Sequence, residues 1–317
     1  MLITYHKTAL HGRSLADFCK DIEGVRLREV DSPDDLEAAA ADSTVLMFNN
    51  PLYTPRMVAA LRQSPVKWIQ LSSTGYDACL QHGVPNSIEV TNAASAWSPI
   101  VAEQALALML GLLRGIHLAE RDRQKSKWDR PAMLNYLSSL EGATVGILGA
   151  GSIGKEIGHR VRAFGARTLF ITRTPRSIEL ADETISVDRV AEALPKIDIL
   201  VSALPLTPQT DKLVDRTWFE KMKSSALFIN VGRGSTVDEL AVLESLEQGV
   251  IAGAGFDVMA VEPMPADHPL WRSERVIITP HVGAFNSRVG VDRLMNLCRV
   301  NIENFLAGRE LLNLVAL

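Results

Sequence analysis

Four side chains with chemical capability stand in segments that directly follow predicted strands in the second half of the chain. Arg233 lies in Asn-Val-Gly-Arg-Gly (230–234), Asp257 in Gly-Phe-Asp-Val (255–258) with Glu262 soon after it, and His281 in Thr-Pro-His-Val-Gly (279–283). An arginine can hold a carboxylate through two parallel hydrogen bonds, and a histidine can exchange a proton near neutral pH. A carboxylate beside the histidine favours its charged form. Taken singly, such residues are more often a structural histidine, a surface charge or a strand-end cap, so their roles depend on the elements around them.

A glycine run is the element around which the second half is organised. The apolar segment Thr144–Leu148 predicts a strand, and glycines spaced G-x-G-x-x-G follow it directly. The next residues have the apolar spacing of a helix. Such a strand, glycine loop and helix predict a dinucleotide site, in which the helix N-terminus binds the pyrophosphate. A glycine-rich turn is the alternative. The residues expected to contact the cofactor here are Gly149, Gly151, Ser152, Ile153 and Gly154.

The end of the second predicted strand indicates which dinucleotide binds. A site for NAD(H) carries an acidic residue about 20 residues past the glycines, where it binds the ribose 2′-hydroxyl. This chain instead has Thr172, Arg173, Thr174 and Arg176 there. Because arginine and threonine can donate hydrogen bonds to a 2′-phosphate, we predict NADP(H) in preference to NAD(H), with NAD(H) possible. Solvated surface arginines are the alternative.

Two modules of alternating strands and helices make up the chain, which predicts an α/β fold with parallel sheets. The long apolar run from Val101 to Ala119 predicts a buried or interface helix, and the charged run from Glu120 to Arg130 predicts a connection. Helix starts are expected at Ser32-Pro33 and Thr54-Pro55. The strands predicted in the first module are Leu2–Tyr5, Val25–Val30, Thr44–Phe48, Trp68–Leu71 and Ile88–Val90. Those predicted in the second are Thr144–Leu148, Thr168–Thr172, Ile197–Ala203, Ala226–Val231, Ala254–Val258 and Val276–Thr279.

Composition limits the possible partners and the compartment. With 317 residues, 47% apolar residues and a formal net charge of −4, the chain has room for two cores and no excess of basic residues for nucleic acid or an anionic membrane. Cys19, Cys79 and Cys298 are widely spaced, which predicts buried free thiols and no metal site. The start of the chain lacks the pattern of a secretory signal. We therefore expect a cytoplasmic protein that binds neither membrane nor nucleic acid.

With these segments in the same order and spacing, the chain resembles the D-isomer-specific 2-hydroxyacid dehydrogenase family. The resemblance also includes Thr74–Asp77, Val101–Glu103 and the lead-in Leu140–Gly142. It implies that Arg233 holds the substrate carboxylate and polarises its keto oxygen. It further implies that His281 is the general acid/base, oriented by Glu262, and that Asp257 lies beside the nicotinamide. Backbone N–H groups of Ser73, Thr74 and Gly75 are expected to receive the substrate carboxylate, and further cofactor contacts are expected at Leu204, Pro205, Thr210, Val231 and Gly283.

The resemblance implies two Rossmann-like, doubly wound domains flanking an active-site cleft. Residues 1–94 with 288–317 would form the substrate domain, and residues 95–287 the dinucleotide domain. A homodimer joined through the Val101–Ala119 helix is implied as well. The expected reaction is reduction of a small 2-oxo acid to the D-2-hydroxy acid, as in the NADPH-dependent glyoxylate and hydroxypyruvate reductases of this family, which the arginines after the second strand favour.

Two alternatives remain open on the sequence alone. One is a dehydrogenase for a larger substrate, with Tyr53, Trp97 or Trp271 shaping its pocket. The other is a dinucleotide-sensing scaffold, because transcriptional corepressors that resemble this family keep the same arginine, glutamate and histidine. Turnover with a panel of 2-oxo acids separates the first alternative from the expected reaction. Cofactor-dependent binding of partner peptides without turnover would indicate the second.

Overall fold

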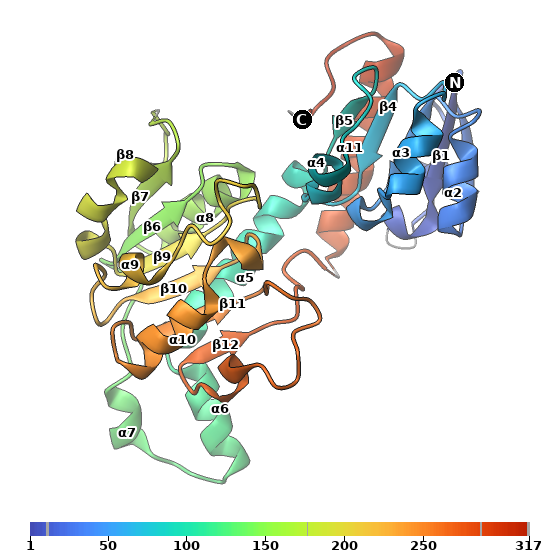
Figure 1. Cartoon of the computed structure of the whole chain (residues 1–317). Coiled ribbons are helices and arrows are strands. Elements are labelled where there is room, and N and C mark those ends of the chain that lie inside the picture. Colours follow the sequence, from blue (N-terminus) through green and yellow to red (C-terminus); the bar gives the residue numbers. More distant parts are fainter. Residues whose placement is uncertain (11–12, 176, 286, 316–317) are drawn as a thin grey trace. The chain divides into compact units, whose positions relative to one another are not determined.

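The computed structural model describes every residue except 11–12, 176, 286 and 316–317. The chain divides into two compact units (Figure 1). Unit 1 comprises Met1–Ser98 and Asn286–Leu317, and unit 2 comprises Pro99–Phe285. Each unit contains one parallel sheet covered by helices, so the expected α/β architecture with two parallel-sheet domains is confirmed.

The sheet of unit 1 has five parallel strands in the order β2-β1-β3-β4-β5. Two predicted helix starts are confirmed: the side chain of Ser32 accepts a hydrogen bond from the backbone N–H of Asp35, and that of Thr54 accepts from Met57. Such caps satisfy N–H groups that the first helical turn leaves unpaired. The strands are β1 (Leu2–His6), β2 (Arg26–Val30), β3 (Val45–Phe48), β4 (Trp68–Leu71) and β5 (Glu89–Thr91). The helices are α1 (Leu15–Cys19), α2 (Pro33–Ala39), α3 (Pro55–Leu61) and α4 (Asp77–His82), with short 3₁₀ turns at Lys7–Leu10 and Asn50–Leu52.

The C-terminal helix α11 (Arg288–Leu306) belongs to unit 1. Arg299 on α11 binds Asp21 through two hydrogen bonds of 2.7 and 2.8 Å, and this guanidinium lowers the pKa of Asp21 to about 2. The buried amide of Asn301 donates to Gln70 of β4 at 3.0 Å. Helix α11 therefore completes the core of a unit whose strands all come from the start of the chain.

The sheet of unit 2 has seven parallel strands in the order β12-β11-β10-β9-β6-β7-β8, each of which is labelled in Figure 1. The strands are β6 (Thr144–Leu148), β7 (Arg167–Thr172), β8 (Glu183–Ser186), β9 (Ile199–Ser202), β10 (Leu227–Asn230), β11 (Gly253–Phe256) and β12 (Val276–Ile278). The helices are α5 (Ala94–Leu113, which begins in unit 1), α6 (Ile116–Gln124), α7 (Arg130–Leu134), α8 (Ser152–Ala163), α9 (Arg216–Phe219) and α10 (Glu239–Glu247). Short 3₁₀ turns lie at Val187–Glu192, Leu194–Lys196, Gly234–Thr236 and Pro269–Arg272.

The seventh strand, β8, is missing from the sequence prediction. Its residues Glu-Thr-Ile-Ser (183–186) include one buried side chain, Ile185, and the strand pairs with β7 alone, at the edge of the sheet. Because an edge strand is partly exposed, it lacks the continuous apolar run that marks a central strand of a parallel sheet.

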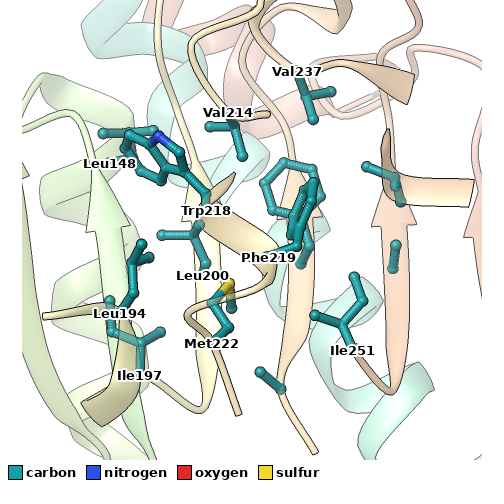
Figure 2. Packing of buried hydrophobic residues seen from close by; sticks show 14 of the residues in the cluster. Leu148, Leu194, Ile197, Leu200, Val214, Trp218, Phe219, Met222, Val237 and Ile251 are labelled. Carbon is teal, nitrogen blue, oxygen red and sulfur yellow. The ribbon is translucent and has the colours of Figure 1, made fainter. Parts of the chain in front are cut away.

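Both faces of the unit 2 sheet are covered, which explains why its central strands are apolar at nearly every position. Neighbouring residues of β6 point to opposite sides: Ile147 packs in the layer that contains α5 and α8, and Leu148 in the layer of α9 and α10. In the second layer, Phe219 and Phe228 meet edge to face with ring centroids 5.4 Å apart. Figure 2 shows Trp218 and Phe219 projecting from α9 among aliphatic side chains of this layer.

The predicted long helix is interrupted, and part of the predicted connection is helical. Helix α5 ends at Leu113, Gly115 adopts a left-handed conformation (φ 61°), and α6 then covers Glu120–Gln124, which we had expected to be a connection. A residue in this conformation ends an α-helix, and glycine adopts it at little cost. Within α6, Arg123 pairs with Glu120 three residues earlier, which favours helix in a polar segment. By length and composition α5 is long and apolar enough to cross a membrane. However, 67% of its most apolar 18-residue stretch is buried within the protein, as in the core helix of a globular domain.

Candidate functional site

The glycine loop between β6 and α8 has the conformation that a phosphate-binding turn requires. Gly149 has φ +103°, which side-chain-bearing residues rarely adopt. A Cβ on Gly154 would lie 2.0 Å from the backbone oxygen of Gly149, so only glycine lets α8 approach the strand this closely. A Cβ on Gly151 would meet nothing within 4 Å, so the backbone there faces open space. The open backbone at Gly151 and the start of α8 at Ser152 and Ile153 fit the pyrophosphate of a dinucleotide.

Two further loops adjoin the glycine loop. A Cβ on Gly149 would lie 3.2 Å from the backbone oxygen of Ala203, and a Cβ on Gly232 would lie 2.6 Å from that of Leu204. Since β9 lies between β6 and β10, the loops that follow these three strands meet at one edge of the sheet. The loop after β9 is closed by Thr210, whose hydroxyl donates to the Pro205 carbonyl at 2.7 Å. The predicted contacts Leu204, Pro205, Thr210 and Val231 are therefore all at or near this edge.

The end of β7 carries the predicted 2′-phosphate residues. The hydroxyl of Thr172 donates to the carbonyl of Thr174 at 3.1 Å, and both Arg173 and Thr174 are exposed. The backbone turns here immediately after the strand, so Arg173 lies at the same carboxyl edge as the glycine loop. Arg176, predicted for the same role, lies outside the described residues.

Glu262 and His281 lie next to each other although they are 19 positions apart in the sequence. Nδ1 of His281 lies 2.7 Å from Oε2 of Glu262. The other carboxylate oxygen, Oε1, accepts a hydrogen bond from the backbone N–H of Met259 at 2.9 Å. The side chain of His281 is 45% exposed and that of Glu262 is 37% exposed. The imidazole is thus anchored on its Nδ1 side, which leaves Nε2 for a reacting oxygen.

Arg233 lies in the loop after β10, and its backbone is fixed. Its carbonyl accepts hydrogen bonds from the Asn230 amide at 3.0 Å and from the Thr236 hydroxyl at 2.7 Å. The next residue, Gly234, packs so closely on the segment that leads to Glu262 that a Cβ would lie 1.9 Å from the carbonyl carbon of Met259. The loops carrying Arg233 and Glu262 are therefore adjacent in unit 2.

The comparisons with known proteins agree with this arrangement. Residues 106–283, more than half of the chain, match the family model for the NAD binding domain of D-isomer specific 2-hydroxyacid dehydrogenases. This chain belongs to the D-isomer specific 2-hydroxyacid dehydrogenase family. The dehydrogenase is therefore an oxidoreductase of 2-hydroxy acids that uses a nicotinamide dinucleotide, as the resemblance predicted.

Individual relatives cover most of the dehydrogenase. It is 34% identical over 248 residues to the glyoxylate reductase/hydroxypyruvate reductase of Homo sapiens, over 77% of this chain and 74% of the relative. It is 31% identical over 286 residues to the glycerate dehydrogenase of Methylorubrum extorquens, over 88% of this chain and 87% of the relative. Among solved structures, a D-isomer specific 2-hydroxyacid dehydrogenase family protein from Aeromonas salmonicida matches with a TM-score of 0.85 and 28% identity, covering 99% of this chain and 98% of that one.

In unit 1 of the dehydrogenase, the predicted substrate loop follows β4. The hydroxyl of Ser73 donates to the Gly75 carbonyl at 2.9 Å, and the Asn92 amide donates to the Thr74 carbonyl at 2.8 Å. Side-chain hydrogen bonds therefore fix the backbone of this loop. Tyr53 and Trp97, which we considered as pocket walls for a larger substrate, are 1% and 3% exposed.

These two aromatic side chains serve the core of unit 1. The hydroxyl of Tyr53 donates to the Gly83 carbonyl at 2.8 Å, and the indole N–H of Trp97 donates to the Ser72 carbonyl at 2.8 Å. Trp271 differs, since it is 52% exposed and donates to the Pro265 carbonyl at 2.9 Å. The burial of Tyr53 and Trp97 therefore gives no support to a role for these two side chains as walls of a larger substrate pocket.

A cavity of about 700 Å³ lies at the opposite edge of the unit 2 sheet. Its wall includes Ala143, Ile199, Leu227 and Gly253, which are at or next to the amino ends of β6, β9, β10 and β11. In parallel α/β sheets the cofactor binds at the carboxyl ends of the strands, where the glycine loop lies. Because of this position, the cavity is not a candidate for the cofactor site.

Two residues at the site were not predicted from the sequence. Thr279 and Gln104 both contact the carboxylate of Asp257, which is 3% exposed. Thr279 lies in the segment 279–283 that contains His281, but its residue type alone indicated no role. Gln104 is 153 residues from Asp257 along the chain, and spacing within a motif carries no signal over that distance.

Proposed function

We propose that this dehydrogenase reduces a small 2-oxo acid of the glyoxylate and hydroxypyruvate class to the D-2-hydroxy acid, with NADPH preferred over NADH. The observation that carries the proposal is the 2.7 Å pairing of His281 Nδ1 with Glu262, in a loop next to that of Arg233. The human relative named glyoxylate reductase/hydroxypyruvate reductase, at 34% identity, supports the substrate class.

The proton and the substrate carboxylate are handled by residues of this chain. The bound nicotinamide supplies the hydride to C2 of the substrate. In the proposed reaction His281 starts as an imidazolium, with one N–H donating to Glu262 and the N–H at Nε2 directed to the keto oxygen. As C2 gains hydride, the keto oxygen takes the proton from Nε2, which leaves a neutral imidazole bonded to Glu262. In unit 2, Arg233 binds the substrate carboxylate and polarises the keto oxygen. In unit 1, the backbone N–H groups of Ser73, Thr74 and Gly75 are the proposed donors to a substrate carboxylate.

The cofactor would be held by the residues around the glycine loop. Its pyrophosphate would lie against Gly151 and the start of α8, and its 2′-phosphate would accept hydrogen bonds from Arg173 and Thr174, with Arg176 as a further donor. Thr172 would join them once its hydroxyl turns away from the Thr174 carbonyl. The preference for NADPH rests on the arginine and the absence of an acidic side chain at Thr172–Thr174. The further proposed contacts are Leu204, Pro205, Thr210, Val231, Asp257 and Gly283.

The experiment that tests the proposal is a steady-state survey in which NADPH or NADH oxidation is followed with glyoxylate, hydroxypyruvate, pyruvate, phenylpyruvate and a branched 2-oxo acid. We expect the highest kcat/KM with glyoxylate or hydroxypyruvate and NADPH. A higher kcat/KM with phenylpyruvate or the branched acid would replace the proposed substrate class. A higher kcat/KM with NADH would overturn the cofactor preference. Lack of turnover with every acid would contradict the reductase.

We also propose a homodimer located in the cytoplasm. The interface predicted along Val101–Ala119 stays a prediction. To it we add the segment from α6 through α7, which exposes large apolar side chains, including Trp128 at 96% and Leu134 at 58%, as is typical of a subunit interface. The three cysteine thiols are free and buried, and burial raises the pKa of Cys79 to about 12. Unpaired thiols of this kind suit a reducing compartment.

A further inference from the structure

His281 has an unusual backbone for a residue with a side chain. Its φ is 53°, in the left-handed region, which costs free energy for a non-glycine residue unless the surroundings impose it. Its N–H lies 2.7 Å from the Asp257 carbonyl and 3.0 Å from that of Thr279, and it donates to both. The conformation that directs the imidazole at Glu262 must therefore be held by neighbouring residues.

The Asp257 carboxylate accepts hydrogen bonds from residues on both sides of His281. Before the histidine, the hydroxyl of Thr279 donates to Oδ1 at 2.6 Å. After it, the backbone N–H of Val282 donates to Oδ1 at 3.1 Å, and that of Gly283 donates to Oδ2 at 2.9 Å. A change of the His281 backbone towards an ordinary conformation would break bonds on at least one side. Breaking hydrogen bonds to the buried carboxylate of Asp257 costs free energy.

Gln104, on α5, donates to the Thr279 hydroxyl and so restricts the directions in which that hydroxyl can point. Its Nε2 donates to the Thr279 oxygen at 2.8 Å and lies 3.4 Å from Oδ1 of Asp257. The hydroxyl of Thr279 has a second possible acceptor, the Phe256 carbonyl at 3.4 Å. Because the amide N–H occupies an acceptor position of the hydroxyl oxygen, the hydroxyl hydrogen is left for the closer carboxylate. A Cβ on Gly283 would lie 2.7 Å from Asp257 Oδ2 and 3.4 Å from Gln104, so the cluster is closely packed.

We propose that Thr279 and Gln104 are positioning residues for His281. Acting through the Asp257 carboxylate, they hold the left-handed backbone that keeps the imidazole against Glu262. This inference rests on the proposed function only in that His281 is the group that delivers the proton. Neither residue needs to touch the substrate, so their removal should lower kcat. Because Asp257 and Gly283 are also proposed cofactor contacts, the Kd for NADPH should change as well, but by less than kcat.

Replacement of one hydroxyl tests the idea. Thr279→Val removes the donor at nearly constant shape, Thr279→Ser restores it, and Thr217→Val is the matched control, because Thr217 donates to Asp215 at 2.6 Å on the exposed start of α9. For Thr279→Val we expect kcat to fall about 10- to 100-fold, with the KM for the 2-oxo acid and the Kd for NADPH within about threefold. Thr279→Ser should return kcat to within about threefold of the wild-type value.

Hydrogen exchange supplies a readout that does not depend on turnover. The amides of Val282 and Gly283 should exchange at least about tenfold faster in Thr279→Val than in the wild type or in Thr217→Val, because their acceptor is no longer fixed. Gln104→Leu should give the same pattern more weakly. The double variant should be about as impaired as Thr279→Val alone, since both residues act through one chain of bonds.

The two proposals can fail separately. Wild-type activity that His281→Ala abolishes, with Thr279→Val keeping both kcat and amide protection, would overturn the positioning role and leave the reductase standing. A wild type without turnover on any 2-oxo acid would remove the reductase, while amide exchange would still report whether Thr279 and Gln104 hold the loop. A loss of kcat in Thr279→Val that merely follows a loss of folded protein would also overturn the positioning role.

Discussion

Oε2 of Glu262 lies 2.7 Å from Nδ1 of His281, and Oε1 of the same carboxylate accepts the backbone N–H of Met259 at 2.9 Å. The carboxylate is thus bonded at both oxygens, one to the ring and one to the backbone of its own loop. The orientation of the imidazole therefore depends on two loops that follow neighbouring strands, β11 and β12. A change in either loop should affect turnover before it affects the fold.

Glu262→Gln tests the charge in this pair. The amide oxygen of glutamine can still accept from Met259, but its NH₂ group cannot stabilise an imidazolium. We expect kcat to fall about 100-fold, within the range that positioned acid/base catalysis contributes, and the Kd for NADPH to stay within about twofold. Steady-state kinetics and cofactor fluorescence titration measure the two quantities. Glu247→Gln, on the exposed end of α10, is the control. Equal kcat in both variants would remove Glu262 from the mechanism.

Arg173→Asp tests the cofactor preference. A carboxylate at the end of β7 would repel a 2′-phosphate and could accept from a ribose 2′-hydroxyl. We expect the KM for NADPH to rise at least about tenfold and the KM for NADH to fall, which reverses the preference. Arg167→Asp provides the control, because Arg167 is exposed at the other end of the same strand. If both variants change the two KM values alike, the effect is one of net charge and not of a 2′-phosphate site.

Acid sensitivity is expected at Asp182. The backbone N–H of Thr168 donates to Oδ2 of Asp182 at 2.8 Å, and the Arg162 guanidinium lies 2.8 Å from Oδ1. Both interactions lower the pKa of this carboxyl. Its contribution to the free energy of unfolding is therefore complete above the ordinary aspartate pKa of about 3.9 and is lost as the pH falls through the lowered value. Asp182→Asn should lower the Tm by about 2 °C at pH 7, a small change because the carboxylate is partly exposed.

The Tm difference between the wild type and Asp182→Asn should shrink below about pH 4, as the wild-type carboxyl gains its proton. Thermal unfolding from pH 3 to pH 7 measures it. Asp188→Asn, an exposed aspartate after β8, serves as the comparison. A Tm difference that stays constant across this pH range would show that Asp182 acts through shape and not through its charge.

Trp128→Ser tests the proposed dimer. In one chain this indole is 96% exposed, and burial in an interface would explain so large an apolar surface. Light scattering after size exclusion should give about twice 34.7 kDa for the wild type and a mass that falls towards 34.7 kDa on dilution of the variant. Phe164→Ser, at the exposed end of α8, should leave the mass unchanged. A wild type that runs as a monomer would refute the dimer.

The elements whose signal is local were predictable from the sequence. Residues 144–154 specify a strand, a turn and a helix within one segment, and the glycines at 149 and 154 stand where a side chain would be strained or would clash. Strand β8 escaped prediction because its position at the sheet edge, not its composition, makes it a strand. The end of α5 depends on one left-handed residue, Gly115, inside an otherwise apolar run.

The site was predictable as a set of residues but not as a geometry. The pairing of Glu262 with His281 followed from the family resemblance, and the structure places these two side chains together. The φ of 53° at His281 was not predictable from the sequence, because positive φ is uncommon even for histidine, although histidine adopts it more often than most side-chain-bearing residues do. The contact between Gln104 and Asp257 is made by tertiary folding alone.

Unit 1 is interrupted along the chain, since Pro99–Phe285 intervenes between its strands and helix α11. A ribosome therefore releases every strand of the five-stranded sheet long before it makes Asn301, whose amide binds Gln70 in the core of that sheet. Unit 2, in contrast, is one continuous segment and can finish folding while unit 1 still waits for its last helix. Unit 2 is thus the first to have all its parts, and the strands of unit 1 must remain soluble with an apolar surface uncovered until α11 has been made.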